Sequence, residues 1–505
     1  MTEDASARSP ALFGQQLQVI TAGVGGFPEA LRRQEVPVVD LQWQPPAEGD
    51  RARGGILRDV ALDPELQQRI DDANRETLER IQQSTPKVHG VAPAGEAMDL
   101  PSRTILHSGP PISWQRMCGP QRRAVLGAIR FEDWADDDQQ AEELVLQGEV
   151  NLAPNHQFRA VGPMTGVISP SMPVLMARNE TFGNWAYSTF NEGRGDTLWF
   201  GIGQPATLER LRWIRDCLGP AVGEALRLHG PFEVFDIVAQ GLQMGDECHA
   251  RHAASTPLWI KRFAPFLLDA GIEPAQVASI LRFADGNSHF FLNFTMVAVK
   301  AVMDAAHGIP YSTVVTAMAR NGVDFMIRVG GLGDKWVVAP VSPMDEAVYF
   351  TGFSVDDAAG DIGDSAIIET CGLGGMAIAA APTVAPFVGG TVAHQAAAVA
   401  KLQTICLGAY ERFRLPTLDG DSPPLGIDLR RVVESRTVPF ITTGVLHETS
   451  STVGQIGTGV ARAPVAVFDG ALEVLANSWG KLSDGNPVAN TVEIEPAEGS
   501  PHDPA

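Results

Sequence analysis

The spacing of apolar positions in the first part of the chain predicts an α/β unit. Residues 17–23 form a short apolar run that leads into a glycine-rich turn and a helix, and residues 36–41 form a second apolar run. A strand, a helix and a strand in this order make the β-α-β unit that begins a doubly wound sheet. Residues 64–83 carry apolar side chains at helical spacing, and residues 104–107 predict a further strand. We therefore expect an N-terminal α/β domain over residues 12–150.

The pattern changes along the rest of the chain. Residues 151–206 are rich in glycine, proline and serine and predict short strands and loops, whereas residues 207–345 show mostly helical spacing. Residues 346–480 alternate short apolar runs with glycine-rich turns, and the polar, acidic residues 481–505 predict a disordered tail. The expected fold class is α/β, with an N-terminal doubly wound-type unit, a central mostly helical domain and a C-terminal α/β segment.

Composition and charge narrow the classes of function. The chain has 505 residues and a formal net charge of −22, so general binding to nucleic acid or to an anionic membrane is not expected. No apolar run reaches the ~18 residues of a membrane helix, and the first ten residues are polar rather than signal-like. The five scattered cysteines contain no Cys-x-x-Cys pair and favour a reducing compartment. We therefore expect a soluble, cytoplasmic protein.

The densest cluster of ionisable residues is the run Met244-Gly-Asp-Glu-Cys-His-Ala-Arg-His252, whose apolar surroundings predict a largely buried helical region. Burying charged groups is costly unless they are paired or reactive. If the run is helical, Asp246 shares a face with His249, and Glu247 shares a face with Arg251. A carboxylate beside an imidazole suits acid–base chemistry near neutral pH. An internal ion-pair network that fixes helix packing is the alternative, and spacing does not distinguish the two.

Further candidates lie at the ends of predicted elements. His107-Ser108-Gly109 ends a predicted strand, where open α/β sheets bind their ligands. His107 could donate to a carbonyl or phosphoryl oxygen, or it could simply cap the strand. His156 precedes a loop rich in glycine and hydroxyl groups that could hold a small anion or form a structural turn. Arg320-Asn321, at a predicted helix end, offers a guanidinium clamp for a carboxylate or phosphate, although a lone arginine is more often an ion-pair residue.

Residues 361–375 are the second dense segment, with three carboxylates, two hydroxyls and several glycines. The polar side chains are Asp361, Asp364, Glu369, Ser365 and Thr370. Their oxygens could ligate a hard cation, and the glycines could equally cradle an anion. No established metal-loop spacing is present, and the pair His249 and His252 lacks both the His-Glu-x-x-His pattern and a third ligand. We expect a functional role for the segment, and no metal.

Several segments in this order resemble one bacterial family long described as a domain of unknown function. They are Leu106-His-Ser-Gly-Pro-Pro-Ile, Met244-Gly-Asp-Glu-Cys-His, Asp304-Ala-Ala-His-Gly-Ile, Met318-Ala-Arg-Asn-Gly-Val and Asp361-Ile-Gly-Asp-Ser-Ala-Ile. One member of that family is a subunit of oxamate carbamoyltransferase in anaerobic allantoin breakdown. The resemblance runs from about residue 12 to about residue 475.

The resemblance implies carbamoyl transfer on a small ureido or amide acid, without a cofactor: oxamate and carbamoyl phosphate would interconvert with oxalurate and phosphate. It also implies a homo- or hetero-oligomer with partner subunits. A hydrolase of a ureido, amide or cyclic imide bond and a non-catalytic subunit are the alternatives, and phosphate dependence separates transferase from hydrolase. The candidate catalytic residues are His249, Asp246, Glu247, His107 and His156. The candidate substrate- and phosphate-binding residues are Arg251, Arg320, Asn321, Ser108, Gly109, Asp364, Ser365, Glu369 and Thr370.

Overall fold

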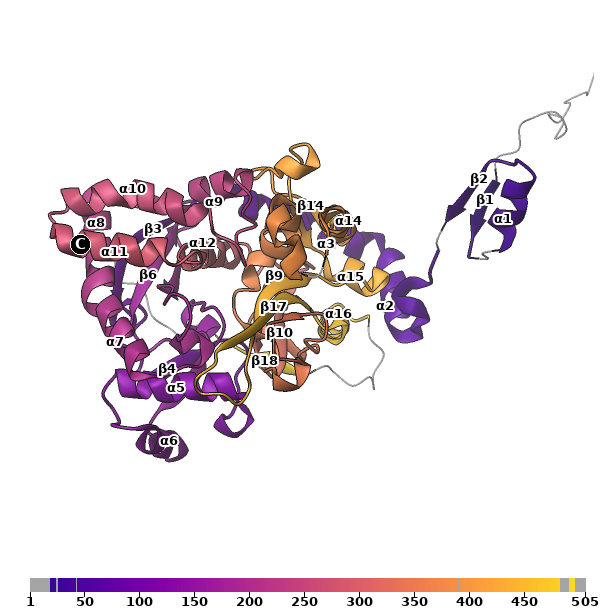
Figure 1. The fold of residues 1–505 in the computed structure, drawn as a ribbon. Coiled ribbons are helices and arrows are strands. Elements are labelled where there is room, and N and C mark those ends of the chain that lie inside the picture. The colour runs from indigo at the N-terminus through magenta and orange to yellow at the C-terminus, as the bar shows by residue number, and fades with distance from the viewer. Residues whose placement is uncertain (1–18, 24–25, 42, 389, 482–489, 496–505) are drawn as a thin grey trace, which may run out of the picture.

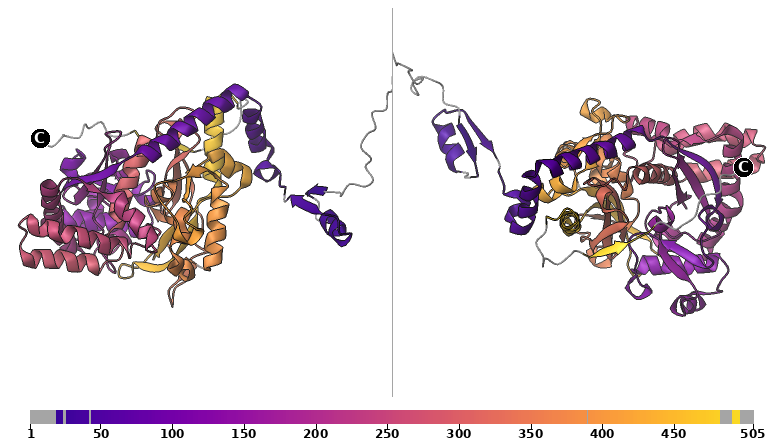
Figure 2. Two further views of the ribbon diagram at one scale, coloured as in Figure 1. Left: turned by 90° about the horizontal axis from the view of Figure 1, so that it is seen from above. Right: turned by 180° about the vertical axis from the view of Figure 1, so that it is seen from behind.

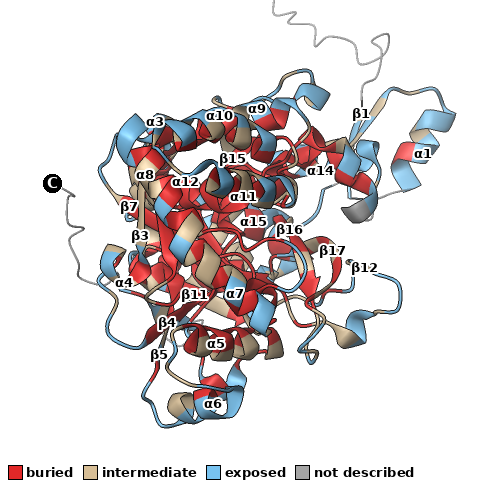
Figure 3. Ribbon diagram, turned by 60° about the vertical axis from the view of Figure 1, so that its left-hand side comes forward, coloured by how far each residue is buried: buried red, intermediate tan, exposed pale blue. Residues whose placement is uncertain are grey.

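The computed structural model describes residues 19–23, 26–41, 43–388, 390–481 and 490–495. Helices and several small sheets are mixed along the chain, which confirms the α/β class (Figure 1). One large apolar core contains buried residues from Ala47 to Ile494, and Figure 3 shows how the buried segments fill the centre of the main body. The predicted domain boundaries stay predictions.

The N-terminal β-α-β unit forms as predicted, but its sheet stops at two strands. Strand β1 (Val19–Ala22) pairs in parallel with β2 (Val38–Leu41), and α1 (Gly26–Arg33) connects them. Figures 1 and 2 show this unit standing apart from the main body. The next strand of the chain joins a different, antiparallel sheet, so no doubly wound sheet grows from the unit. Part of its glycine-rich turn, residues 24–25, lies outside the described residues.

The first part of the main body combines one antiparallel sheet with a parallel pair. The sheet has the order β7-β6-β3-β8, and β4 pairs in parallel with β5. Helix α3 occupies the 20 residues Pro64–Gln83 that the apolar spacing predicts, and its preceding residue Asp63 caps it by accepting from the N–H of Leu66. The strands are β3 (Pro86–Pro93), β4 (Thr104–His107), β5 (Asn151–Pro154), β6 (Pro173–Asn179), β7 (Trp185–Thr189) and β8 (Phe232–Glu233). The other helices are α2 (Arg51–Ala61), α4 (Ala94–Ala97), α5 (Gly119–Phe131) and α6 (Asp138–Leu146).

The central region is helical only as far as Ala305. Its helices are α7 (Pro205–Trp213), α8 (Gly219–His229), α9 (Val234–Gln243), α10 (Ser255–Asp269), α11 (Pro274–Asp285) and α12 (Leu292–Ala305). Strands β9 (Val315–Asn321) and β10 (Asp324–Val329) follow as an antiparallel hairpin. The helical expectation was wrong here because β9 is buried at every residue and so lacks the alternation that marks a half-exposed strand. Arg320 and Asn321 therefore end a strand and not a helix.

Within its described residues, the C-terminal part contains two sheets, a strand pair and four α-helices. A five-stranded sheet has the order β13-β9-β10-β11-β18, a three-stranded sheet the order β12-β17-β16, and β14 pairs with β15. The strands are β11 (Lys335–Pro340), β12 (Val348–Tyr349), β13 (Ile362–Gly363), β14 (Cys406–Ala409), β15 (Pro424–Ile427), β16 (Phe440–Leu446), β17 (Gln455–Arg462) and β18 (Thr491–Glu493). The helices are α13 (Ile367–Thr370), α14 (Val392–Gln403), α15 (Leu429–Ser435) and α16 (Val465–Ser478). Strand β18 lies within the expected tail; residues 482–489 and 496–505 of that tail lie outside the described residues.

Two sequence expectations concern the chain as a whole. All five cysteines carry free thiols. Within the described ranges, no helix combines the length and the apolar character needed to cross a bilayer.

Candidate active site

A cavity of about 510 Å³ lies where the α9–α10 loop, the loop after β7, the segment before α13 and the β16–β17 hairpin meet. Residues far apart in the sequence line it together. Its polar lining residues are Arg194, Trp199, His249, Arg251, His252, Ser288, His289, Ser365, Thr442, Thr443, Gln455 and Thr458. Apolar side chains, including Met164, Phe200, Leu292, Phe350 and Val384, cover the rest. A concave, largely apolar pocket with a few convergent polar groups is typical of a site for a small molecule.

The run 244–252 forms a loop between α9 and α10, so the conditional helical pairing of its side chains does not occur. Two residues explain the break in the helix: Gly245 has φ +98° and Cys248 has φ +65°, both in the left-handed region. The loop separates the groups that a helix would have placed on one face. Asp246 turns towards α10, while His249 faces the cavity.

The carboxylate of Asp246 caps helix α10. It accepts from the backbone N–H of Ala254 and of Ser255, at 3.0 and 2.7 Å, and from the Ser255 hydroxyl at 2.8 Å. Arg251 Nε lies 3.7 Å from Asp246 Oδ1 and donates to the carbonyl of Gly245. These bonds occupy both oxygens of the carboxylate, so Asp246 holds the loop in place and is not free to take a proton from a ligand.

His249 and Glu369 form a dyad at the edge of the cavity. His249 Nδ1 lies 2.7 Å from Glu369 Oε1, and both side chains are buried. The same oxygen accepts from the backbone N–H of Gly375 at 3.1 Å and of Thr442 at 3.3 Å. Gly374 must be glycine here, because its φ is +60° and a Cβ would lie 2.4 Å from that oxygen. With Nδ1 fixed, Nε2 is the histidine nitrogen left for a ligand.

Glu247 is a second buried carboxyl group beside this dyad. Its Oε1 accepts from the N–H of Arg251 at 2.6 Å, and its Oε2 accepts from the N–H of His249 at 3.2 Å and from the Thr442 hydroxyl at 3.3 Å. Burial raises the pKa of Glu247 to about 7, with Glu369 adding to the shift and His249 opposing it. We call His249, Glu369, Glu247 and Thr442 the cavity cluster.

The members of a second group of buried charged residues do not line the cavity. Lys300, in the apolar helix α12, places Nζ 3.1 Å from His156 Nδ1 and 2.8 Å from Asp304 Oδ1, and Arg328 also donates to Asp304. His156 Nε2 lies 3.8 Å from Asp364 Oδ1. Burial, reinforced by Lys300 and Arg328, holds the pKa of His156 well below its usual range. We call His156, Lys300, Asp304, Arg328 and Asp364 the enclosed cluster.

The predicted segment His107-Ser108-Gly109 joins this enclosed cluster and does not line the cavity. Gly109 donates its N–H to Asp364 Oδ1 at 2.9 Å, while Asn155 and Gly162 donate to Oδ2. Burial raises the pKa of Asp364 to about 6. His107 is buried with Nδ1 2.8 Å from the Ser108 carbonyl, and burial lowers the pKa of His107 to about 4.

The remaining predicted residues occupy different surroundings. Arg320 makes a bidentate ion pair with Asp361, at 2.7 and 2.9 Å, and donates to the Gly363 carbonyl and to Thr443, so it orients Thr443 instead of facing a ligand. Asn321 and Thr370 bond to backbone carbonyls. Ser365 lines the cavity. The carboxylates of residues 361, 364 and 369 each bind different partners, and no group of three potential ligands in the described part of the chain is placed to hold a metal ion.

Sequence reasoning missed Arg194, Trp199, His289 and the two threonines of β16. Arg194 lies between two glycines in a loop that carried no sign beyond turn formation. Trp199 Nε1 and His252 Nδ1 are buried, and neither has a hydrogen-bond partner among the described residues. His289 Nε2 lies 2.6 Å from the Ala250 carbonyl, and burial lowers the pKa of His289 to about 4. Only the fold brings these groups to the cavity.

Comparison with known proteins gives consistent relatives. The family model described as oxamate carbamoyltransferase subunit AllG matches residues 150–365. The AllG subunit of Escherichia coli (strain K12) is 43% identical over 415 residues, covering 81% of this chain and 99% of that protein. The uncharacterized protein YahG of the same strain is 40% identical over 469 residues, covering 92% of this chain and 98% of that protein. A crystal structure of a conserved protein of unknown function from Enterococcus faecalis V583 matches with a TM-score of 0.79 and 37% identity, covering 82% of this chain and 99% of that one.

Proposed function

Because this chain belongs to the family of AllG, the oxamate carbamoyltransferase subunit, we propose that it is a carbamoyltransferase subunit acting on a small ureido or amide acid. The observation that carries the proposal is the dyad at the cavity, in which Glu369 holds His249 Nδ1 at 2.7 Å and leaves Nε2 for a ligand. Ordered carboxylate–histidine pairs of this kind suit proton transfer near neutral pH.

The proposed reaction interconverts oxalurate and phosphate with oxamate and carbamoyl phosphate. In the direction of cleavage, a phosphate oxygen attacks the ureido carbonyl carbon, the bond from that carbon to the oxamate nitrogen breaks, and the nitrogen takes up a proton. In the reverse direction, the amide nitrogen loses a proton as it attacks the carbamoyl carbon, and phosphate leaves. An amide nitrogen is a poor nucleophile and a poor leaving group, so both directions need a positioned acid or base.

We assign this proton transfer to His249. Donation of the Nδ1 proton to Glu369 fixes the tautomer in which Nε2 accepts a proton, and the carboxylate stabilises the imidazolium that forms. Asp246 is the weaker candidate because its oxygens are held by the N-terminus of α10. The carbonyl oxygen that gains charge needs a donor, and the hydroxyl of Ser365 lines the same cavity.

Partner subunits belong to the proposal, since the relative that carries a function is named as a subunit. We propose a hetero-oligomer in the cytoplasm in which this chain supplies the cavity. The free thiols of all five cysteines support a reducing compartment.

The test is phosphate-dependent cleavage of oxalurate and related ureido acids by the purified full-length chain. Carbamoyl phosphate that appears only when phosphate is present supports the proposal. Ammonia or carbamate released without phosphate would replace it with a hydrolase. An inert chain that gains activity on addition of its co-purifying subunits, and keeps that activity when His249 is replaced by alanine, would make it a non-catalytic subunit.

A further inference from the structure

Two arginines that line the cavity have terminal guanidinium nitrogens that are not bonded to any carboxylate in the described ranges. The exposed Arg194 donates from Nη2 to the Ser288 hydroxyl and makes no ion pair with any described residue. Arg251 uses Nε on the Gly245 carbonyl and lies 3.7 Å from Asp246, whereas its two terminal nitrogens make no hydrogen bond within the described ranges. In a chain with a net charge of −22, two guanidinium groups whose terminal nitrogens are not bonded to a carboxylate in the described ranges favour an anionic ligand in this cavity.

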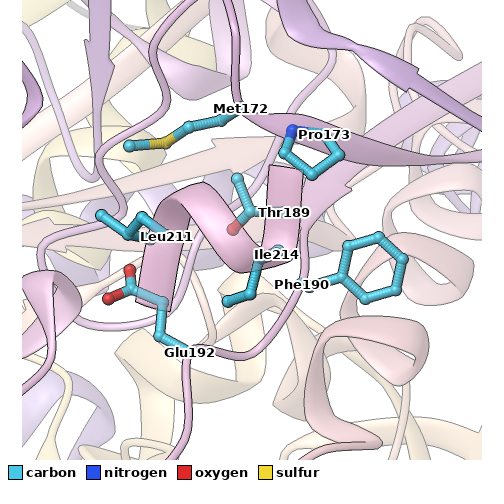
Figure 4. Close-up of a pocket in the computed structure, with 7 residues that line it drawn as sticks. All are labelled: Met172, Pro173, Thr189, Phe190, Glu192, Leu211 and Ile214. Atoms are coloured by element: carbon cyan, nitrogen blue, oxygen red, sulfur yellow. The ribbon is translucent and has the colours of Figure 1, made fainter. Parts of the chain in front are cut away.

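The loop that carries Arg194 is held at both ends. Glu192 Oε2 accepts from the N–H of Leu198 at 2.6 Å, and Arg210 Nη1 donates to the Asp196 carbonyl at 2.9 Å. Figure 4 shows Glu192 beside Leu211 at a small cavity of about 10 Å³, near the size of one water molecule. Between these anchors, Gly193 and Gly195 have φ of +104° and +79°, a tight course that glycine permits. These two hydrogen bonds hold the backbone on both sides of Arg194 in place at the cavity.

We propose that Arg194 and Arg251 form the phosphoryl-binding half of the cavity. Two guanidinium groups match the charge of a phosphate dianion, whereas a single carboxylate needs only one. The choice of phosphate or an acyl phosphate as ligand rests on the proposed function; the anion-binding site itself rests on the two guanidinium groups. Arg194 is therefore the residue that selects a phosphoryl group over the substrate carboxylate.

The test is calorimetric titration of the full-length chain with inorganic phosphate, and separately with oxamate. Arg194→Gln should weaken phosphate binding about tenfold to a hundredfold, the loss expected for a hydrogen bond to a charged group. Arg194→Lys should lose less, since it keeps the charge but not the fork of donors. Arg75→Gln, which removes the same charge from the exposed face of α3, should bind phosphate as the wild type does.

Other results would overturn the inference. They are no phosphate binding by the wild-type chain at millimolar concentrations, equal binding by the wild type and Arg194→Gln, or a loss confined to oxamate. Because Arg194 is exposed, its variants should unfold at the wild-type temperature without phosphate, which separates a binding defect from a folding defect. If the chain binds phosphate through Arg194 but never transfers a carbamoyl group, the proposed function is wrong and the anion-binding site is still supported.

Discussion

The cavity cluster and the enclosed cluster are built from the same kinds of residue and differ in access. Each has a histidine close to a buried carboxylate: His249 with Glu369 at 2.7 Å, and His156 with Asp364 at 3.8 Å. His249 borders a cavity of about 510 Å³, and its Nε2 bonds to no residue in the part of the chain that the structure describes. His156 has a fully buried side chain and faces Lys300 with its other nitrogen.

The difference teaches that buried charge alone does not mark a catalytic site. In the enclosed cluster the charges compensate one another: burial alone would raise the pKa of Asp304, but Lys300 and Arg328 hold it below its usual range. Burial lowers the pKa of Lys300 to about 8, and the nearby carboxylate of Asp304 opposes that shift. The cavity cluster has no such internal balance, because burial raises the pKa of Glu247 to about 7 and no lysine or arginine side chain is bonded to Glu247 or Glu369 among the described residues.

Removing the cavity histidine should have the largest effect. His249→Ala should lower the rate of carbamoyl transfer about 10²- to 10⁴-fold, the usual contribution of a positioned acid–base group. The measurement is kcat for phosphate-dependent cleavage, with His89→Ala on β3 as the control. An equal loss of rate in a stably folded His156→Ala chain would break the comparison, since access would then not decide which histidine reacts.

The enclosed cluster should instead govern stability. Lys300→Met keeps the length of the side chain and removes one of the two cations bonded to Asp304, so the free energy of unfolding should fall by about 1.5–3 kcal/mol, the value of a hydrogen bond to a charged group. Urea denaturation measures it, and Lys335→Met on the surface should change little. We expect turnover per folded molecule to stay near the wild-type value. Lost turnover at unchanged stability would move Lys300 into the chemistry.

The pH dependence of stability should also show the difference between the two clusters. The pKa of Glu247 rises from 4.5 to about 7 on folding, so between these values the folded chain holds a proton that the unfolded chain releases. The free energy of unfolding therefore falls as pH rises through this window, and is flat for this group above it. Glu247→Gln stays neutral and should escape a loss on the order of 3 kcal/mol.

Unfolding of both proteins in urea at several pH values from below 4.5 to above about 7 tests this. Glu79→Gln, on the exposed face of α3, should keep the wild-type dependence. Parallel curves for the wild type and Glu247→Gln would show that the buried carboxyl group does not titrate in this window.

Local patterns in the sequence predicted local structure well. Helix α3 has the bounds that the apolar spacing predicts. It begins at Pro64 because Asp63 caps its first turn and proline suits the first helical position. Strand β9 was missed because full burial removes the alternation on which strand prediction relies, although Asn321-Gly322 is a hairpin signal in itself.

The candidate site was only partly accessible to sequence reasoning. The run 244–252 was found because ionisable residues stand out in apolar surroundings, yet its partner Glu369 lies 120 residues away and no spacing links the two. Arg194 gave no signal, since one arginine between glycines is ordinary for a loop. Pairing across the fold depends on tertiary contacts, and those contacts leave no periodic trace in the chain.

The contact of Gly109 has a consequence for how the chain is made. A Cβ at Gly109 would lie 2.4 Å from the backbone of Arg320, and its N–H bonds to Asp364, 255 residues later. The end of β4 therefore cannot take its final form while the ribosome is still translating that stretch, which lasts roughly 13–50 s at ordinary elongation rates. During this interval the apolar segment of β4 lacks its final contacts. We therefore expect the early segments to need shielding from aggregation, for example by a chaperone, while the chain is being made. A truncated product that ends before Asp364 would leave these segments without their final contacts and prone to aggregate.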